Sequence, residues 1–108
     1  MQNLESTHDL DAALQAPVAV LLKYSTTCPI SANARREMTS LEGRFPDQKM
    51  YGVDVHRARD VSAAVAQRLG AEHESPQLFI LRGGKPVYTV THWDISAQDV
   101  ERELAAAP

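Results

Sequence analysis

The sequence of 108 residues contains a single cysteine, Cys28, and lacks features that several large classes of protein require. One cysteine excludes an internal disulfide and a zinc site built from several cysteines. No segment approaches the roughly 20 consecutive apolar residues that span a bilayer. The 11 basic residues against 14 acidic ones give a net charge of −3. This balance argues against nucleic acid and against an anionic membrane surface as partners.

Internal repeats and segments rich in proline, glycine or serine are also missing, so no linker between domains is visible. The length and the ordinary hydrophobic content of 44% fit one compact domain over residues 1–108. The first residues carry Glu5, Asp9 and Asp11 and no apolar run. We therefore expect no signal peptide and a cytoplasmic location, where thiols stay reduced. We expect the protein to be a monomer with no bound cofactor.

Helical and strand patterns alternate along the chain. The continuous apolar run over residues 17–24 predicts a strand that is buried on both faces. Further strands are expected at 49–55, 77–81 and 87–91, with a frayed first strand at 2–4. Helices are expected between Ser6 and Pro17, from Pro29 to a stop at Gly43, through Val61 and Leu69 to a stop at Gly70, and after Ser96.

The last two strands are expected to form a hairpin through the turn Gly83-Gly84. Pro86 places the final strand at an edge of the sheet, because proline cannot donate a hydrogen bond to a neighbouring strand. The order of elements predicts an α/β fold with a mixed central sheet and helices on both faces. This order matches the thioredoxin-like fold.

Cys28 lies at the junction between the buried strand and the second helix. If it caps that helix, Pro29 occupies the first helical position, where a missing N–H costs nothing. The free N–H groups of Ile30 and Ser31 then point toward the sulfur. Together with the helix dipole they favour the thiolate, which is the form that attacks disulfides. We interpret Cys28 as a nucleophile, and the alternative is a small buried hydrophobic residue.

The segment Thr27-Cys28-Pro29-Ile30-Ser31 resembles the TCPIS signature of the monothiol bacilliredoxins of the bacillithiol system. The resemblance extends along the chain and includes Ser75-Pro76 and the segment 92–96. It implies a thioredoxin-like thiol–disulfide oxidoreductase with bacillithiol as co-substrate. In that function Cys28 takes bacillithiol from bacillithiolated client proteins, and an external low-molecular-weight thiol then regenerates it.

The resemblance also implies which residues surround the substrate. Besides the catalytic Cys28, these are Thr27, Pro29, Ile30, Ser31, Ser75, Pro76 and Trp93. It further implies that the Ser75-Pro76 bond is cis. The alternative for Trp93 is a core or surface-packing role, which is the commoner one for a single tryptophan.

Ser31 stands where dithiol redoxins have a second cysteine, so it cannot close an internal disulfide. Two interpretations of its hydroxyl remain open. It could donate a hydrogen bond to the Cys28 sulfur, or it could satisfy backbone groups near the start of the helix.

Lys23 and the histidines have plainer interpretations. Lys23 is expected to be a solvated lysine at a strand end, with binding of a ligand carboxylate, such as the malyl group of bacillithiol, as the alternative. His8, His56 and His73 show no metal-ligand spacing and are expected to be solvated, so we expect no metal site.

Three other functions fit parts of the sequence. A peroxide reductase is excluded because Leu21 stands where its motif requires proline. A monothiol glutaredoxin would pair its cysteine with a serine three residues later and could bind an iron–sulfur cluster between two chains. In this sequence Pro29-Ile30 replaces the Gly-Phe of that class, and the glycine pair lies in the hairpin. A non-catalytic interaction module remains open, because fold does not determine function.

Overall fold

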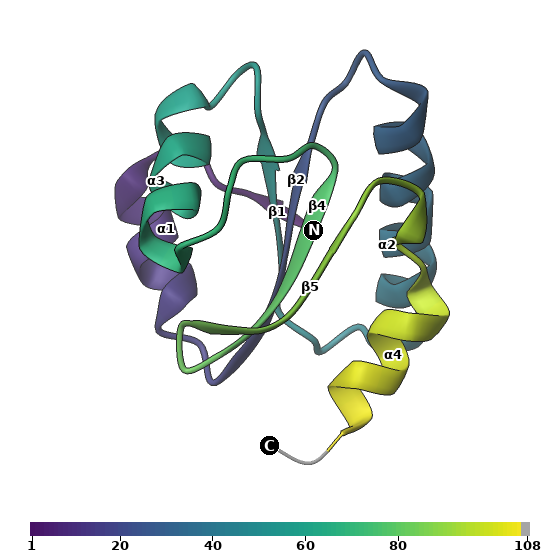
Figure 1. The fold of residues 1–108 in the computed structure, drawn as a ribbon. Coiled ribbons are helices and arrows are strands. Elements are labelled where there is room, and N and C mark those ends of the chain that lie inside the picture. Colours follow the sequence, from purple (N-terminus) through teal and green to yellow (C-terminus); the bar gives the residue numbers. More distant parts are fainter. Residues whose placement is uncertain (107–108) are drawn as a thin grey trace.

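The computed structural model describes residues 1–106, and the last two positions of the domain expected over 1–108 lie outside the described residues. A five-stranded sheet lies between two pairs of helices (Figure 1). The strands are β1 (Gln2–Asn3), β2 (Val18–Tyr24), β3 (Met50–Asp54), β4 (Gln77–Arg82) and β5 (Lys85–Thr91). The helices are α1 (Thr7–Leu14), α2 (Pro29–Arg44), α3 (Arg59–Leu69) and α4 (Ala97–Ala105), with a 3-10 turn η1 (His92–Asp94) before α4. No helix within residues 1–106 is long and apolar enough to cross a membrane.

The sheet has the order β1-β3-β2-β4-β5, so β2 lies at its centre. β1 and β2 pair with β3 in parallel, whereas β4 runs antiparallel to both β2 and β5. Lys23 therefore lies opposite Gln77, and Gln77 lies opposite Thr91. This register brings four connections to the same end of the strands: residues 25–28, 55–58, 70–76 and 92–94 (Figure 1). We call this end of the sheet the Cys28 edge, as distinct from the outer strands β1 and β5.

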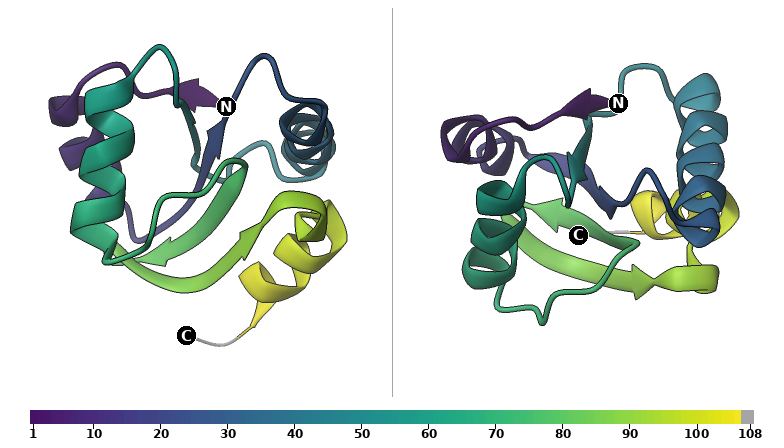
Figure 2. Two further views of the ribbon diagram at one scale, coloured as in Figure 1. Left: turned by 45° about the horizontal axis from the view of Figure 1, so that its top comes forward. Right: turned by 90° about the horizontal axis from the view of Figure 1, so that it is seen from above.

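The core consists of two apolar layers, one on each face of the sheet. Alternate residues of β2 point to opposite faces. Leu21 packs with Phe79 beneath α1 and α3, and Leu22 packs with Leu78 beneath α2 and α4. Both helical layers are visible in the rotated views (Figure 2). The expectation that this apolar run forms a strand buried on both faces is confirmed.

The helix ends follow the sequence signals except at one place. Ser6 and Ser96 accept hydrogen bonds from the N–H groups of Asp9 at 3.1 Å and Asp99 at 3.2 Å. Gly70 ends α3 in the left-handed conformation, with φ of 62°. The predicted stop of α2 at Gly43 is wrong, because the helix continues through Arg44. Pro46 explains the true end, since the residue before a proline is pushed out of helical conformation.

The hairpin turn and the last turn of α2 give a matched pair of glycine substitutions. Gly84 has φ of 78°, and an added Cβ would lie 2.7 Å from the carbonyl oxygen of Leu14. At Gly43 nothing lies within 4 Å. We expect Gly84→Ala to lower the free energy of unfolding by roughly 2 kcal/mol. Gly43→Ala should raise it by about 0.5–1 kcal/mol through helix propensity.

Urea denaturation followed by circular dichroism measures both effects. Equal changes in the two variants would contradict the close approach of the turn to the end of α1.

Candidate active site at Cys28

Cys28 occupies the N-cap position of α2, as the sequence predicts. Its backbone is extended, with φ of −109° and ψ of 125°, and Pro29 follows at the start of the helix. The carbonyl oxygen of Cys28 accepts the N–H of Ala32 at 3.0 Å, which closes the first helical turn. The thiol is half-buried and makes no capping hydrogen bond. Cys28 is therefore partly exposed at the positive end of a 16-residue helix.

Three hydroxyl groups hold the loop that leads to Cys28. Ser31 Oγ accepts the N–H of Ser25 at 3.0 Å. Ser25 Oγ in turn accepts the N–H of Thr27 at 3.2 Å and lies 3.1 Å from Thr27 Oγ1. Ser31 is 0% exposed. Its hydroxyl thus satisfies a backbone group and positions the loop that leads to Cys28.

The role of Ser25 is missed in the sequence analysis. The signal for it is a serine two residues before another hydroxyl residue, which is the spacing of a local side-chain-to-backbone turn.

The segment before β4 lies beside the turn after β5. The Ser75-Pro76 bond is cis, as the resemblance implies. The carbonyl oxygen of Pro76 accepts the N–H of His92 at 3.0 Å. His92 has φ of 54°, and its ring lies 3.7 Å from the carboxylate of Glu74. The turn η1 is thereby attached to the cis-proline segment.

The residues expected around the substrate come from the first turn of α2 and from three connections at the Cys28 edge. Thr27 and Pro29 are exposed, and Ile30 is half-buried beside Cys28. Pro76 is buried, and the hydroxyl of Ser75 is buried without a hydrogen-bond partner. Trp93 is 64% exposed, which is incompatible with a role in the core.

Lys23 departs from its expected place. It is 0% exposed, because β2 is the central strand and α3 covers this face. Its Nζ donates to the carbonyl oxygen of Ser62 at 3.3 Å and lies 2.7 Å from Nδ1 of His73. The expectation of a solvated lysine is wrong. Burial lowers the pKa of Lys23 to about 8.

The contact between Lys23 and His73 assigns the protons of the pair. Two donors cannot face each other at 2.7 Å, so the ammonium donates and Nδ1 accepts. His73 is then neutral and carries its proton on Nε2. Burial and the charge of Lys23 lower the pKa of His73, opposed by the carboxylate of Glu74, which agrees with the neutral ring.

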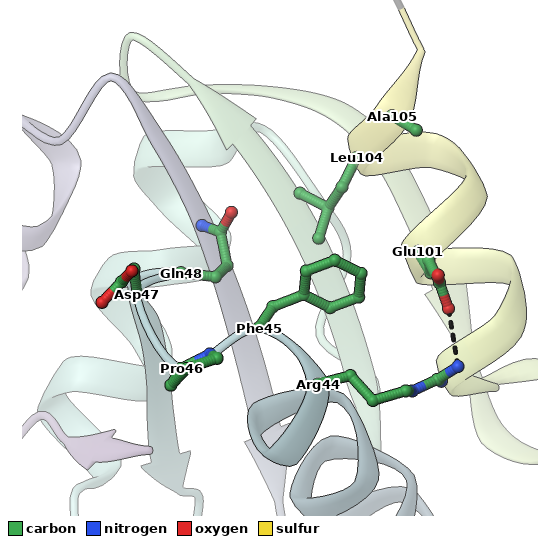
Figure 3. Close-up of a pocket in the computed structure, with 8 residues that line it drawn as sticks. All are labelled: Arg44, Phe45, Pro46, Asp47, Gln48, Glu101, Leu104 and Ala105. Carbon is green, nitrogen blue, oxygen red and sulfur yellow. Dashed lines mark ion pairs between the residues drawn. The ribbon is translucent and has the colours of Figure 1, made fainter.

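A cavity of about 640 Å³ lies away from this site (Figure 3). The end of α2, the connection 45–48 and the end of α4 line it, and an ion pair of 2.8 Å between Arg44 and Glu101 lies at its side. The length of α2 separates it from Cys28 by about 24 Å, taking 1.5 Å for each of 16 residues. We do not assign it to the active site.

A mixed sheet of this order, a thiol at a helix N-terminus and a neighbouring cis proline define a thioredoxin-fold thiol–disulfide oxidoreductase. A solved structure whose description proposes an oxidoreductase with a thioredoxin fold is 30% identical, with a TM-score of 0.88 over 94% of this chain and 90% of that one. Fasciola hepatica thioredoxin is 16% identical, with a TM-score of 0.77 over 96% of each chain, and shares the fold. Mitochondrial thioredoxin 3 from Saccharomyces cerevisiae also shares it, at 15% identity and a TM-score of 0.74 over 95% of this chain and 92% of that one.

The family model of the monothiol bacilliredoxin BrxC matches residues 2–100. The chain belongs to this family. Its thiol–disulfide redox function therefore follows from fold, site and family together.

The buried Lys23 predicts an unusual dependence of stability on pH. Its pKa is about 8 in the folded protein and rises toward 10.5 on unfolding, so the unfolded state binds more protons between these values. The free energy of unfolding should therefore rise with pH across that window. Lys23→Met should remove this rise and raise stability at pH 7, by up to about 3 kcal/mol.

Urea denaturation at pH 7 and at pH 10 tests this, with the exposed Lys85→Met as the control. A Lys23→Met protein that is less stable than the parent at pH 7 would show that the hydrogen bonds of Lys23 outweigh its cost of burial.

Proposed function

We propose that this protein removes bacillithiol from mixed disulfides on client proteins. The Cys28 thiolate attacks the bacillithiol sulfur, a disulfide forms between Cys28 and bacillithiol, and the client sulfur leaves as a thiolate. An external thiol then attacks the bacillithiol sulfur of this adduct. A disulfide of the two small thiols is released, and Cys28 returns to the thiolate form.

The observation that carries this proposal is the environment of the single thiol. Cys28 is accessible at the start of α2, whereas the position three residues later is Ser31, a fully buried serine that holds the loop. An internal disulfide cannot form. The site therefore favours transfer of a thiol group to Cys28, followed by release to a second molecule.

The surroundings of Cys28 support binding of an extended client segment. We propose that Thr27, Pro29 and Ile30 contact the client on the α2 side, and that Ser75 and Pro76 offer backbone groups on the β4 side. Trp93 presents a large apolar surface from η1, which the hydrogen bond between His92 and Pro76 attaches to the same segment. Exposed tryptophans of this kind are enriched among residues that dominate binding.

The position of the glycine pair does not favour the glutaredoxin alternative. Gly83 and Gly84 form the β4–β5 turn, where Gly84 lies against the end of α1. This turn is at the edge of the sheet opposite Cys28 (Figure 1). It cannot contribute to a small-thiol site beside the cysteine. We also propose a cytoplasmic location, since a reducing compartment keeps Cys28 available between cycles.

Cys28→Ser tests the reaction directly. We expect the parent protein to release bacillithiol from a bacillithiolated client and to acquire one bacillithiol, seen by mass spectrometry of the intact protein. The variant should do neither, because serine at this position is not a nucleophile toward disulfides. A glutathionylated client serves as the comparison.

Equal or faster release of glutathione would contradict bacillithiol as the co-substrate. If Cys28 of the parent protein is unreactive, and Cys28→Ser binds the client as well as the parent does, a non-catalytic interaction module is favoured.

Trp93→Ala tests client docking. We expect KM for a bacillithiolated protein to rise about tenfold, because a central exposed tryptophan is lost from the interface. The rate with a small mixed disulfide of bacillithiol should stay within about twofold. Equal losses with both substrates would show that Trp93 shapes the site itself and does not act in client binding.

A further inference from the structure

A second pocket opens at the Cys28 edge on the α3 side of the sheet. Its volume is about 370 Å³, and its lining residues are Val55, His56, Arg59, Ser62, Ala63 and His73. Three of the six carry basic side chains, and none is acidic. The pocket lies between the connection that follows β3 and the connection that precedes β4.

Lys23 adds a charge behind the wall of this pocket. Its ammonium contacts two of the lining residues, Ser62 and His73, and both hydrogen-bond partners are uncharged. A buried charged group is ordinarily paired with an opposite charge, because its removal from water costs free energy. The positive charge of Lys23 has no such partner in its hydrogen bonds and contributes to the potential at the pocket.

His73 connects the buried ammonium of Lys23 to the surface of the pocket. Its Nδ1 accepts from Lys23, so the remaining ring proton lies on Nε2, on the opposite side of the ring from the buried ammonium. The polarisation by Lys23 strengthens Nε2–H as a donor. Arg59 is exposed and adds a planar fork of donors, which matches a carboxylate in two parallel hydrogen bonds.

Two of the neighbouring acidic groups, Asp54 and Glu74, have other partners. Asp54 accepts the N–H groups of His56 and Arg57, at 3.1 and 3.2 Å. Glu74 lies 3.7 Å from His92, at the cis-proline segment. The carboxylate of Glu74 also acts on His73, where it opposes the effect of Lys23 on the pKa, so the positive charge near the pocket is partly compensated.

We propose that this pocket binds the carboxylates of the low-molecular-weight thiol that Cys28 exchanges. The choice of ligand rests on the function proposed above, in which the thiol is bacillithiol, and its malyl group is a dicarboxylate. Lys23 is next to the last residue of β2, five residues before Cys28, and the two pocket connections border the Cys28 edge. A thiol anchored by its carboxylates in this pocket would direct its sulfur along the edge toward Cys28.

Direct binding is tested with the full chain and free malate as the probe. Nuclear magnetic resonance titration should show saturable shifts of the amides of Arg59, Ser62 and His73. Arg59→Gln and His73→Gln should each weaken binding about tenfold, because each removes a strong donor to a carboxylate. The control is Arg57→Gln, an exposed arginine on the same connection that lines a different cavity, and it should stay within about twofold.

Turnover separates this site from the reaction at Cys28. With a bacillithiolated client, Arg59→Gln should raise KM about tenfold and leave kcat within about twofold. With a client carrying cysteamine, a small thiol without carboxylates, the parent and Arg59→Gln should not differ.

Three outcomes would overturn the proposal: malate that shifts none of these amides, inorganic phosphate that binds while malate does not, or an Arg59→Gln variant with unchanged KM for the bacillithiolated client. In the last case an active parent protein leaves the proposed function standing. A parent protein that is inactive on bacillithiolated clients removes the proposed function, whether or not malate binds.

Discussion

The rest of the molecule depends on the burial of β2 between two helical layers. This strand pairs with β3 on one side and with β4 on the other, so its direction and register fix the positions of both neighbours. Its apolar residues divide between the two cores. Because the strand cannot shift without exposing one of these cores, the point where it ends is also fixed. Cys28 follows β2 after a loop of a few residues, so the position of the strand determines the position of the thiol.

Two positive features meet at this end of β2, and they have different origins. The first is the start of α2, where Cys28 lies at the positive end of the helix dipole. The second is the ammonium of Lys23, which the central strand holds beneath α3 at the expense of its solvation. The first belongs to the reacting atom. The second lies on the other face of the sheet, next to a separate pocket, and so can act on a different part of a bound molecule.

The elements of this fold were largely predictable, because each depends on local signals. Ser6 and Ser96 cap their helices, Gly70 ends α3, and Pro86 marks the edge strand. The position of Cys28 at a helix start followed from the same kind of signal. What could not be predicted depends on contacts between distant segments.

From the sequence alone, Lys23 is a lysine near a strand end and is expected to be solvated. Its burial depends on α3, which packs over it, and on His73, which lies 50 positions later in the chain. The turn η1 likewise requires the left-handed backbone of His92. The sequence gives no signal for this conformation, because the residue is not a glycine. For Ser31, the sequence left two partners possible, and only the folded loop selects the N–H of Ser25.

The outer strands of the sheet have a consequence for assembly. β5 begins with Lys85 and Pro86, so part of its open edge lacks a backbone donor and carries a charge. β1, at the other edge, is only two residues long. β1 is thus too short, and β5 is interrupted at its start, so neither edge is a regular template over its full length for an added strand. These features of the two edges disfavour the addition of other chains, or of copies of the protein itself, to a growing β-structure.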